Sequence, residues 1–154
     1  MTPFLIESVD GIKDLVGKEI GVSDWLVLTQ ERINAFADAT GDRQWIHLDV
    51  ERANRESPFG KTIAHGFLTL SLLSHLMQQT IQMRVGARLA VNYGLNRVRF
   101  PAPVREGSRI RGRFALASFK DLGDSHEAIF GCMVECEGME KPACVAEWIV
   151  RYFK

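Results

Sequence analysis

The sequence predicts an α+β domain in which an antiparallel sheet curls around one long buried helix. Helical patterns dominate the first half of the chain and strand patterns the second half, and this segregation is typical of the α+β class. One central segment is apolar around nearly its whole helical circumference, which indicates a buried helix. Short turns separate the later strand patterns, and short turns favour antiparallel neighbours.

Length and charge limit the classes of protein that the chain can represent. Its 154 residues suggest one domain over residues 1–154, with room for a sizeable core. Lys plus Arg and Asp plus Glu are both 19, so there is no overall charge that would favour nucleic acid. No apolar run is long enough to span a membrane, and the acidic N-terminus does not resemble a signal peptide. We therefore expect a cytoplasmic protein with no nucleic-acid or membrane partner.

The cysteines and histidines do not form a recognisable metal motif. The three cysteines are an odd number without CxxC spacing, so they are expected to be small buried hydrophobes in a reducing compartment. The four histidines lack HxH or HxxxH spacing with carboxylate support. We therefore predict no metal. The residues concerned are Cys132, Cys136, Cys144, His47, His65, His75 and His126.

The first half of the chain contains clear helix boundaries. Residues 30–40 carry apolar side chains at i, i+3 and i+4, and Thr29 precedes them as a suitable N-cap. Gly41 fits the position after the helix, where a left-handed backbone is needed. Asp49 can cap a second, short helix. A short strand is expected before the first of these helices, at residues 25–28.

The second half predicts the buried helix and the sheet. The helix is expected over residues 62–83, with His65-Gly66 near its start. Turn sequences "PAPV", "KDLGDS" and "EGMEKP" lie between the strand patterns that follow. One buried helix followed by an antiparallel meander corresponds to the hotdog arrangement. The strand patterns cover residues 89–100, 108–119, 126–137 and 143–153.

The stretch "TGDRQWIHLD", from Thr40, holds the first candidate site. Asp42 and His47 are five residues apart in a segment without strong periodicity, so a loop can turn both side chains toward one point. A carboxylate and an imidazole that meet at one water can activate it and return its proton, and histidine titrates near neutral pH. The alternative interpretation is an ordinary turn with a buried histidine beside Trp45.

Gly66 is the second candidate. Backbone N–H groups at the start of a helix have no intrahelical partner, and glycine allows a ligand carbonyl to approach the backbone closely. Such a group can stabilise the oxyanion of a thioester. The alternative interpretation is that Gly66 only allows the helix to begin close to packed neighbours.

Together these motifs resemble one known family. "FADATGDRQWIHLDVERA" resembles the signature of the MaoC-like dehydratases, the hydratase 2 family of (R)-specific enoyl-CoA hydratases. "IAHGFLTLSLLS" and "NYGLNRVRFPAPVREGSRIRG" resemble the family's central helix and the strand after it, so the resemblance runs from about Phe36 to Gly112. Gln44 and Trp45 replace the usual Asn-Pro, which resembles a branch that includes nodulation protein N.

The resemblance implies a hotdog fold, a homodimer and a specific reaction. The family adds water reversibly to trans-2-enoyl-CoA and forms the (R)-3-hydroxyacyl-CoA, with no cofactor beyond the CoA of the substrate. The family's catalytic pair corresponds to Asp42 and His47. Its carbonyl-binding glycine corresponds to Gly66, and a further substrate-binding serine corresponds to Ser74. Gln44 and Trp45 are expected to contact the substrate. Gln44 can orient a side chain or a water, and the bulky Trp45 is expected to reshape the acyl pocket and so to influence chain-length preference.

Two other functions remain open. A hotdog acyl-CoA thioesterase would hydrolyse the thioester, and a non-catalytic hotdog protein would only bind an acyl chain. The Asp-x4-His loop before the central helix favours the hydratase. Several arginines are able to bind the CoA phosphates, but a solvated strand face is the favoured interpretation. They are Arg97, Arg99, Arg109, Arg111 and Arg113.

Overall fold

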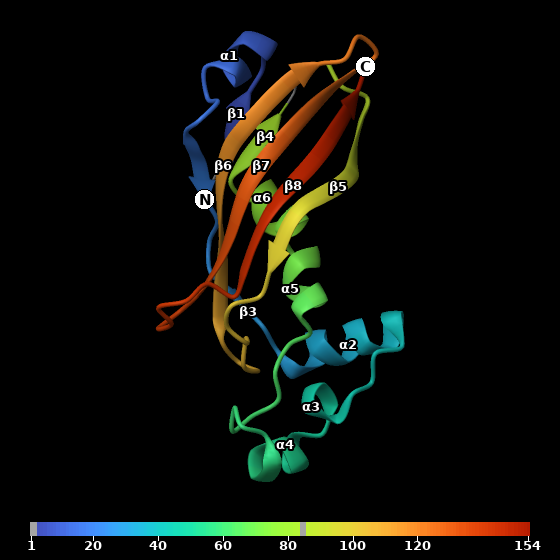
Figure 1. Cartoon of the computed structure of the whole chain (residues 1–154), viewed down its shortest axis with the longest axis vertical. Coiled ribbons are helices and arrows are strands. Elements are labelled where there is room, and N and C mark those ends of the chain that lie inside the picture. Colours follow the sequence, from blue (N-terminus) through green and yellow to red (C-terminus); the bar gives the residue numbers. More distant parts are fainter. Residues whose placement is uncertain (1–2, 84–85) are drawn as a thin grey trace.

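A six-stranded antiparallel sheet curves around two short central helices (Figure 1). The computed structural model describes residues 3–83 and 86–154. The sheet has the order β2-β6-β7-β8-β5, and β3 also pairs with β6. The strands are β2 (Glu19–Val22), β3 (Leu26–Val27), β5 (Leu89–Arg99), β6 (Arg109–Asp121), β7 (Ser125–Cys136) and β8 (Cys144–Phe153). The predicted sheet curled around a helix is confirmed.

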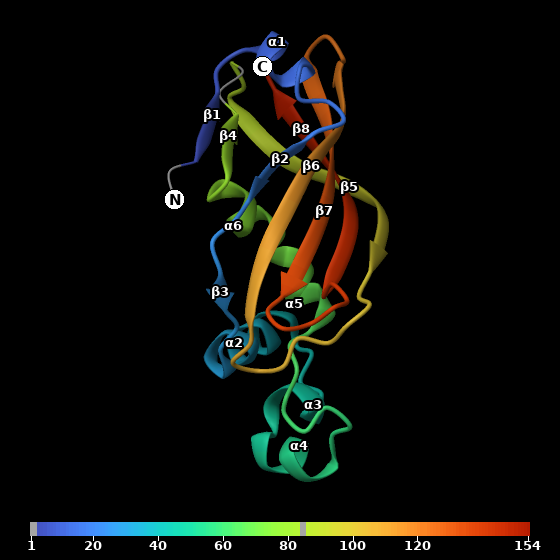
Figure 2. The same cartoon turned by 90° about the vertical axis from the view of Figure 1, so that its left-hand side faces the viewer.

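The helices form two groups. Helices α5 (Gly66–Ser71) and α6 (Leu73–Gln78) lie against the concave face of the sheet, whereas α2, α3 and α4 lie beyond one end of it (Figures 1 and 2). A parallel pair of short strands completes the other end, beside α1. The remaining elements are α1 (Val9–Lys13), α2 (Gln30–Thr40), α3 (Trp45–Leu48), α4 (Val50–Glu56), β1 (Phe4–Ile6) and β4 (Ile81–Met83).

Alternation of buried and more exposed side chains along the long strands builds the core. Every second side chain of β7 and β8, and of β6 as far as Leu116, is buried, and these side chains pack against the apolar residues of α5 and α6. Burying this apolar surface is the main favourable contribution to folding. Fully buried members include Ile110, Phe114, Phe130, Val134 and Leu76.

The central helix is shorter than predicted and is interrupted. The segment expected to be helical over residues 62–83 begins at Gly66, breaks at Leu72 and ends at Gln78. The Ser71 hydroxyl donates to the Leu68 carbonyl at 2.8 Å, and this kind of back-bonding bends helices. The Thr80 N–H and hydroxyl both donate to the Met77 carbonyl, which closes the last turn. Residues after that turn form β4 and pair with β1.

The position of β5 also differs from the meander that was predicted. β5 pairs with β8 at the far side of the sheet instead of with β6. The connection after β5 contains Pro101 and Pro103, which lack the N–H needed to continue a ladder. It instead crosses the start of the central helix, where Ala64 N–H donates to the Val104 carbonyl at 2.8 Å. The two later turns do form hairpins, as predicted.

All three cysteines are free and buried. Burial raises the pKa of the Cys132 thiol to about 12 and that of Cys144 to about 11, so both are unreactive as nucleophiles near neutral pH. This agrees with the prediction of small buried hydrophobes. In the described part of the chain, no helix has the length and apolar character needed to cross a membrane.

Candidate active site

The end of α2 places Asp42. Thr29 caps the start of this helix by accepting a hydrogen bond from the Arg32 N–H at 3.3 Å. Gly41 ends it with a left-handed backbone, φ 78°, as predicted. Asp42 therefore leaves the helix directly into the loop that leads to α3. Its side chain is exposed, and the Gln44 N–H lies 3.5 Å from the carboxylate Oδ1.

His47, by contrast, is buried and held in a defined orientation. It lies in the short helix α3 and not, as predicted, in a non-helical loop, and Gln30 of α2 donates to its backbone carbonyl at 2.7 Å. The ring Nδ1 lies 2.7 Å from the Ile63 carbonyl oxygen. A carbonyl only accepts hydrogen bonds, so Nδ1 carries the proton and Nε2 is left as the acceptor in the neutral ring. Burial is the largest effect on this ring and lowers its pKa below the usual 6.5.

Smaller effects act on His47 in both directions. The hydrogen bond to Ile63 and the charge of Asp42 raise the pKa, while the neighbouring His65 lowers it. The net result is a lowered pKa, which keeps the imidazole neutral at neutral pH. A neutral ring with a free Nε2 is the form that can accept a proton from water.

The structure brings Asp42 and His47 together, and it adds His65 to them. Within the described residues, the ligand atoms of these three side chains all lie within 4.8 Å of one another. The rings of His47 and His65 are stacked, with centroids 3.8 Å apart. Sequence reasoning assigned His65 only to the start of the helix and missed its contact with the loop. The available signal was its place directly before Gly66, but a contact across 23 residues cannot be read from spacing.

Gly66 is the first residue of α5 and follows His65 directly. It is half-buried, and its N–H lies in the first turn, where no intrahelical acceptor exists. A Cβ at this position would lie 3.1 Å from the ring of Phe100, so the absence of a side chain also allows close packing here. Both interpretations of this glycine made from the sequence are therefore compatible with the geometry.

Gln44 and Trp45 border the loop but face different surroundings. Gln44 is exposed and precedes α3. Trp45 is half-buried, and the guanidinium of Arg52 in α4 lies over its ring at 4.2 Å. This contact directs the indole toward α4. The substrate contact of Gln44 and the role of Trp45 in shaping the acyl pocket therefore stay predictions.

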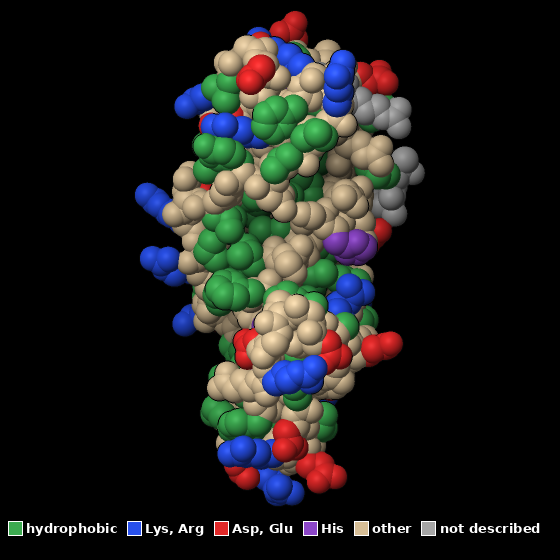
Figure 3. All heavy atoms as spheres, turned by 90° about the vertical axis from the view of Figure 1, so that its right-hand side faces the viewer, with side chains coloured by type: hydrophobic (Ala, Val, Ile, Leu, Met, Phe, Trp, Pro, Cys, Tyr) green, Lys and Arg blue, Asp and Glu red, His purple; other side chains and the backbone are tan. Residues whose placement is uncertain are grey.

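Ser74 lies in a different region, on a pair of adjoining grooves beside β5. The grooves have volumes of about 500 and 310 Å³, and Ser74, Asn92 and Trp148 line both of them. Neither Asp42 nor His47 is among the described residues that line these grooves. Figure 3 shows this face of the molecule, where hydrophobic side chains gather around the hollow. Along the interrupted central helix, Ser74 lies about two helical turns after Gly66.

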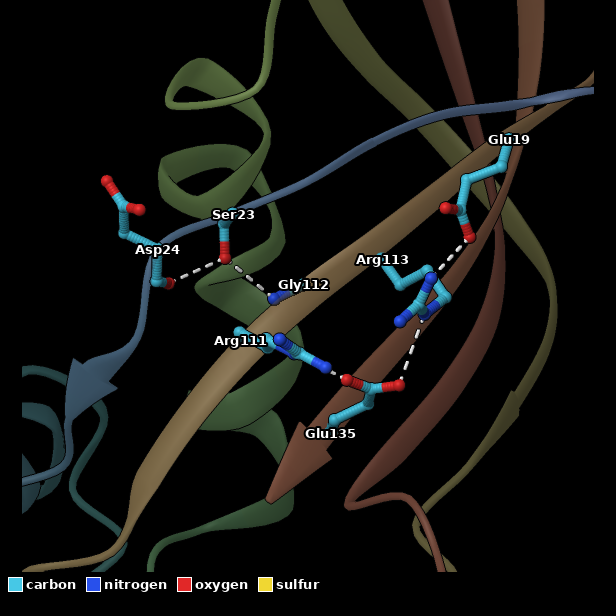
Figure 4. A network of polar contacts seen from close by, with 7 residues as sticks. All are labelled: Glu19, Ser23, Asp24, Arg111, Gly112, Arg113 and Glu135. Carbon is cyan, nitrogen blue, oxygen red and sulfur yellow. Dashed lines mark hydrogen bonds and ion pairs between the residues drawn. The ribbon is translucent and has the colours of Figure 1, made fainter. Parts of the chain in front are cut away.

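The arginines of the outer sheet face are mostly engaged with carboxylates. Glu135 accepts hydrogen bonds from Arg111 at 2.6 Å and from Arg113 at 3.1 Å, and Arg113 also reaches Glu19 at 2.7 Å (Figure 4). Arg109 pairs with Glu137 at 2.9 Å. These pairs support the interpretation of a solvated strand face.

The cluster of Asp42, His47 and His65 is also the place where a cation could be held. It supplies one carboxylate and two imidazoles, a donor set that suits a transition metal. His47 Nδ1 is hydrogen-bonded to the Ile63 carbonyl and His65 Nε2 to the backbone carbonyl of Asp42, so each ring keeps its other nitrogen, His47 Nε2 and His65 Nδ1. These hydrogen bonds leave one possible ligand atom on each of the three side chains, and the absence of a metal stays a prediction from the sequence.

Fold and site together define a class of protein. The protein has a hotdog fold, with a carboxylate and an imidazole beside the start of its central helix. The sequence matches the family described as "MaoC like domain" over residues 12–132. The chain belongs to this family, as the resemblance of its motifs predicted.

Curated relatives resemble the chain over nearly its full length. The 3-hydroxyacyl-thioester dehydratase Z of Mycobacterium tuberculosis is 55% identical, and the match covers 95% of this chain and 96% of the relative. Nodulation protein N of Rhizobium meliloti is 46% identical, with 92% and 89% covered. The predicted resemblance to the nodulation protein N branch is confirmed.

A solved structure supports the fold independently. A monoamine oxidase regulatory protein from Archaeoglobus superimposes with a TM-score of 0.78 and covers 100% of this chain, with 99% of its own chain covered. The two sequences are 24% identical, so the likeness concerns the fold alone.

Proposed function

We propose that this protein is an (R)-specific enoyl-CoA hydratase, which adds water reversibly to a trans-2-enoyl-CoA and forms the (R)-3-hydroxyacyl-CoA. The observation that carries the proposal is the convergence of the Asp42 carboxylate with the ring of His47, whose Nδ1 is hydrogen-bonded to Ile63, close to His65 directly before the helix that begins at Gly66. The similarity to the relative named 3-hydroxyacyl-thioester dehydratase Z supports this proposal, because dehydration of a 3-hydroxyacyl thioester is the reverse of the proposed hydration.

The proposed reaction follows from these groups. Asp42 and His47 hold one water between them, and the pair takes a proton from that water as its oxygen forms a bond to C3 of the substrate. The electrons of the double bond move toward the thioester carbonyl, whose oxygen accepts a hydrogen bond from the Gly66 N–H. The pair then returns a proton to C2. Atoms and charge balance without a metal or a redox cofactor.

Ser74, Gln44 and Trp45 are proposed to contact the substrate. The grooves beside Ser74 are lined largely by apolar side chains, and apolar grooves with a few polar groups suit an acyl chain and its thioester. Gln44 and Trp45 lie at the entrance to α3, next to the proposed catalytic pair. We assign them to acyl-chain selection.

We also propose a homodimer, because β5 is an edge strand with exposed apolar side chains. Large apolar residues along β5 and the adjacent α5 are between 43% and 69% exposed, and they include Phe67, Leu89, Tyr93 and Leu95. Long apolar edge strands attract further strands unless they are covered. Pairing with the same strand of a second copy would cover this surface (Figure 3). The three free cysteines support a reducing compartment, for which we propose the cytoplasm.

The direct test is a spectrophotometric assay of the purified protein. Loss of the enoyl absorbance with crotonyl-CoA and longer homologues, with identification of the (R)-isomer of the product, is the expected result. A free-thiol assay runs in parallel. Release of CoA without loss of the double bond would support a thioesterase instead. No change in either assay would support a non-catalytic acyl-binding protein.

A further inference from the structure

His65 lies where the two parts of the proposed site meet, although no step of the proposed reaction uses it. It is the residue before Gly66, and it is 3% exposed. Its side chain does not cap its own helix. Instead it points back to Asp42, in the loop between α2 and α3, and to His47 of α3.

Its first contact is with the backbone of Asp42. The Nε2 atom of His65 lies 3.0 Å from the Asp42 carbonyl oxygen. Because a carbonyl only accepts, Nε2 carries the proton of the neutral ring. Among the hydrogen bonds of the described residues, the exposed carboxylate of Asp42 takes part only in the long 3.5 Å contact with the Gln44 N–H, so its position depends on how firmly its backbone is held. The hydrogen bond from His65 provides that restraint.

Its second contact is with the ring of His47. The two imidazoles stack at 3.8 Å with an interplanar angle of 26°, and Phe36 packs on His65 at 4.9 Å. The hydrogen bond from Nδ1 to Ile63 anchors one edge of the His47 ring. The stacked His65 then restricts rotation about that hydrogen bond, and the direction of the free Nε2 is defined.

The remaining nitrogen of His65 argues against a role in proton transfer. Its Nδ1 is buried, and among the described residues no hydrogen-bond partner lies within reach. A proton bound there would be buried without an acceptor, which is costly. The ring therefore works through its Nε2–H and its faces.

We propose that His65 is a positioning residue that holds Asp42 and His47 in register with the Gly66 N–H. The proposal rests on the hydratase function proposed above. One residue is covalently joined to the carbonyl-binding glycine, hydrogen-bonded to the backbone of the carboxylate and stacked on the imidazole. Loss of its donor should disturb the geometry of catalysis more than the binding of substrate.

Two substitutions separate the hydrogen bond from the ring. His65→Phe keeps a planar ring for stacking but has no donor, whereas His65→Gln loses the ring and places an amide N–H near the position of Nε2. We expect His65→Phe to lower kcat by on the order of tenfold to a hundredfold, as small misplacements of catalytic groups do, with KM changed by less. We expect His65→Gln to retain more of the wild-type kcat. His75→Gln, at an exposed histidine of α6, is the matched control and should behave as the wild type.

The possible outcomes distinguish this proposal from the proposed function. An inactive wild type would reject the hydratase function and this role with it. An active wild type with normal kcat in folded His65→Phe would overturn the role of His65 alone. If His65→Phe does not fold, His65→Asn replaces it, because its shorter amide cannot reach the Asp42 carbonyl. Equal kcat in the Asn and Gln variants would then overturn the proposal.

Discussion

The two members of the proposed catalytic pair lie in unlike environments. His47 is 8% exposed and fixed by a hydrogen bond at Nδ1, whereas Asp42 is exposed and lightly held. A buried neutral base beside an accessible carboxylate suits a site that must accept a bulky thioester and a water together. Both residues could be predicted from sequence because they are only five positions apart in the chain. The participation of His65 could not, since it depends on how the loop packs against a helix that begins far along the chain.

Removing either member of the pair should disable the same step. Asp42→Asn keeps the shape of the side chain but loses the base, and His47→Gln loses the titrating ring. We expect each to lower kcat by on the order of a hundredfold to ten-thousandfold. The double variant should lose far less than the product of the two, because groups that act as a unit are not additive. Initial rates of enoyl-CoA hydration measure this. Strictly multiplicative losses would mean that the residues serve separate steps.

The lowered pKa of His47 predicts the acid side of the pH profile. The neutral ring is the active form, so kcat/KM for hydration should fall on acidification with a midpoint below 6.5, the usual value. The unfolded chain binds more protons just below pH 6.5 than the folded one, so the free energy of unfolding should also fall as the pH drops through that value. A rate profile from pH 4.5 to 8 gives the midpoint. A midpoint above 6.5 that shifts in no histidine variant would contradict the assignment.

The role of Gly66 can be separated from its packing. Gly66→Ala and Gly66→Pro both place a Cβ 3.1 Å from the Phe100 ring, but only proline removes the N–H. Proline is tolerated in the first turn of a helix, and the extended backbone of His65, ψ 136°, is compatible with a following proline. We expect kcat of the Pro variant to be lower than that of the Ala variant by on the order of a hundredfold. Equal rates in the two folded variants would show that another group binds the carbonyl oxygen.

At the scale of helices and strands, short sequence motifs predicted the features that depend only on neighbouring residues, namely helix caps and hairpin turns. The caps of α2 and α4 and the two late hairpins follow from residues within a few positions of each boundary. The bend at Ser71, the parallel pair of β1 and β4, and the place of β5 depend on partners that are distant in sequence. Periodicity identifies a strand, but it does not identify the neighbour of that strand.

The outer face of β6 and β7 provides a test at this scale. Hydrogen bonds from Arg111 and then from Arg113 lower the pKa of the Glu135 carboxyl below its usual 4.5. Glu135→Gln should therefore reduce the free energy of unfolding at pH 7 by about 1 kcal/mol or less, because the groups are partly solvated. Glu137→Gln is the control, since Glu137 pairs with Arg109 alone in the described contacts and is more exposed.

The sign of the pH dependence follows from the lowered pKa. The ionised Glu135 stabilises the fold above about pH 4.5, and this contribution is lost as the pH falls through the lower pKa of the folded state. Denaturant titrations at pH 7 and in strong acid should show a difference between wild type and Glu135→Gln only at pH 7. A difference that persists in acid would point to packing instead of charge.

At the scale of the whole molecule, two exposed apolar surfaces need different explanations. Val91 of β5 and Val145 of β8 are 44% and 38% exposed, and each is a valine on a strand of the same sheet. Val145 lies on a strand with neighbours on both sides, whereas β5 has a neighbour on one side only. An unpaired edge can accept another strand, and an internal strand cannot.

Val91→Lys should therefore separate the proposed homodimer, because lysine on an edge strand opposes pairing with a second edge. Val145→Lys adds the same charge to the same sheet and should leave the dimer intact. Sedimentation at assay concentration measures both, and hydratase rates measured on the same samples show whether the single chain is sufficient for turnover. A wild-type protein that sediments as a fully active monomer would reject the dimer. A monomeric Val145→Lys with a dimeric Val91→Lys would move the interface from the β5 edge to the outer face of the sheet.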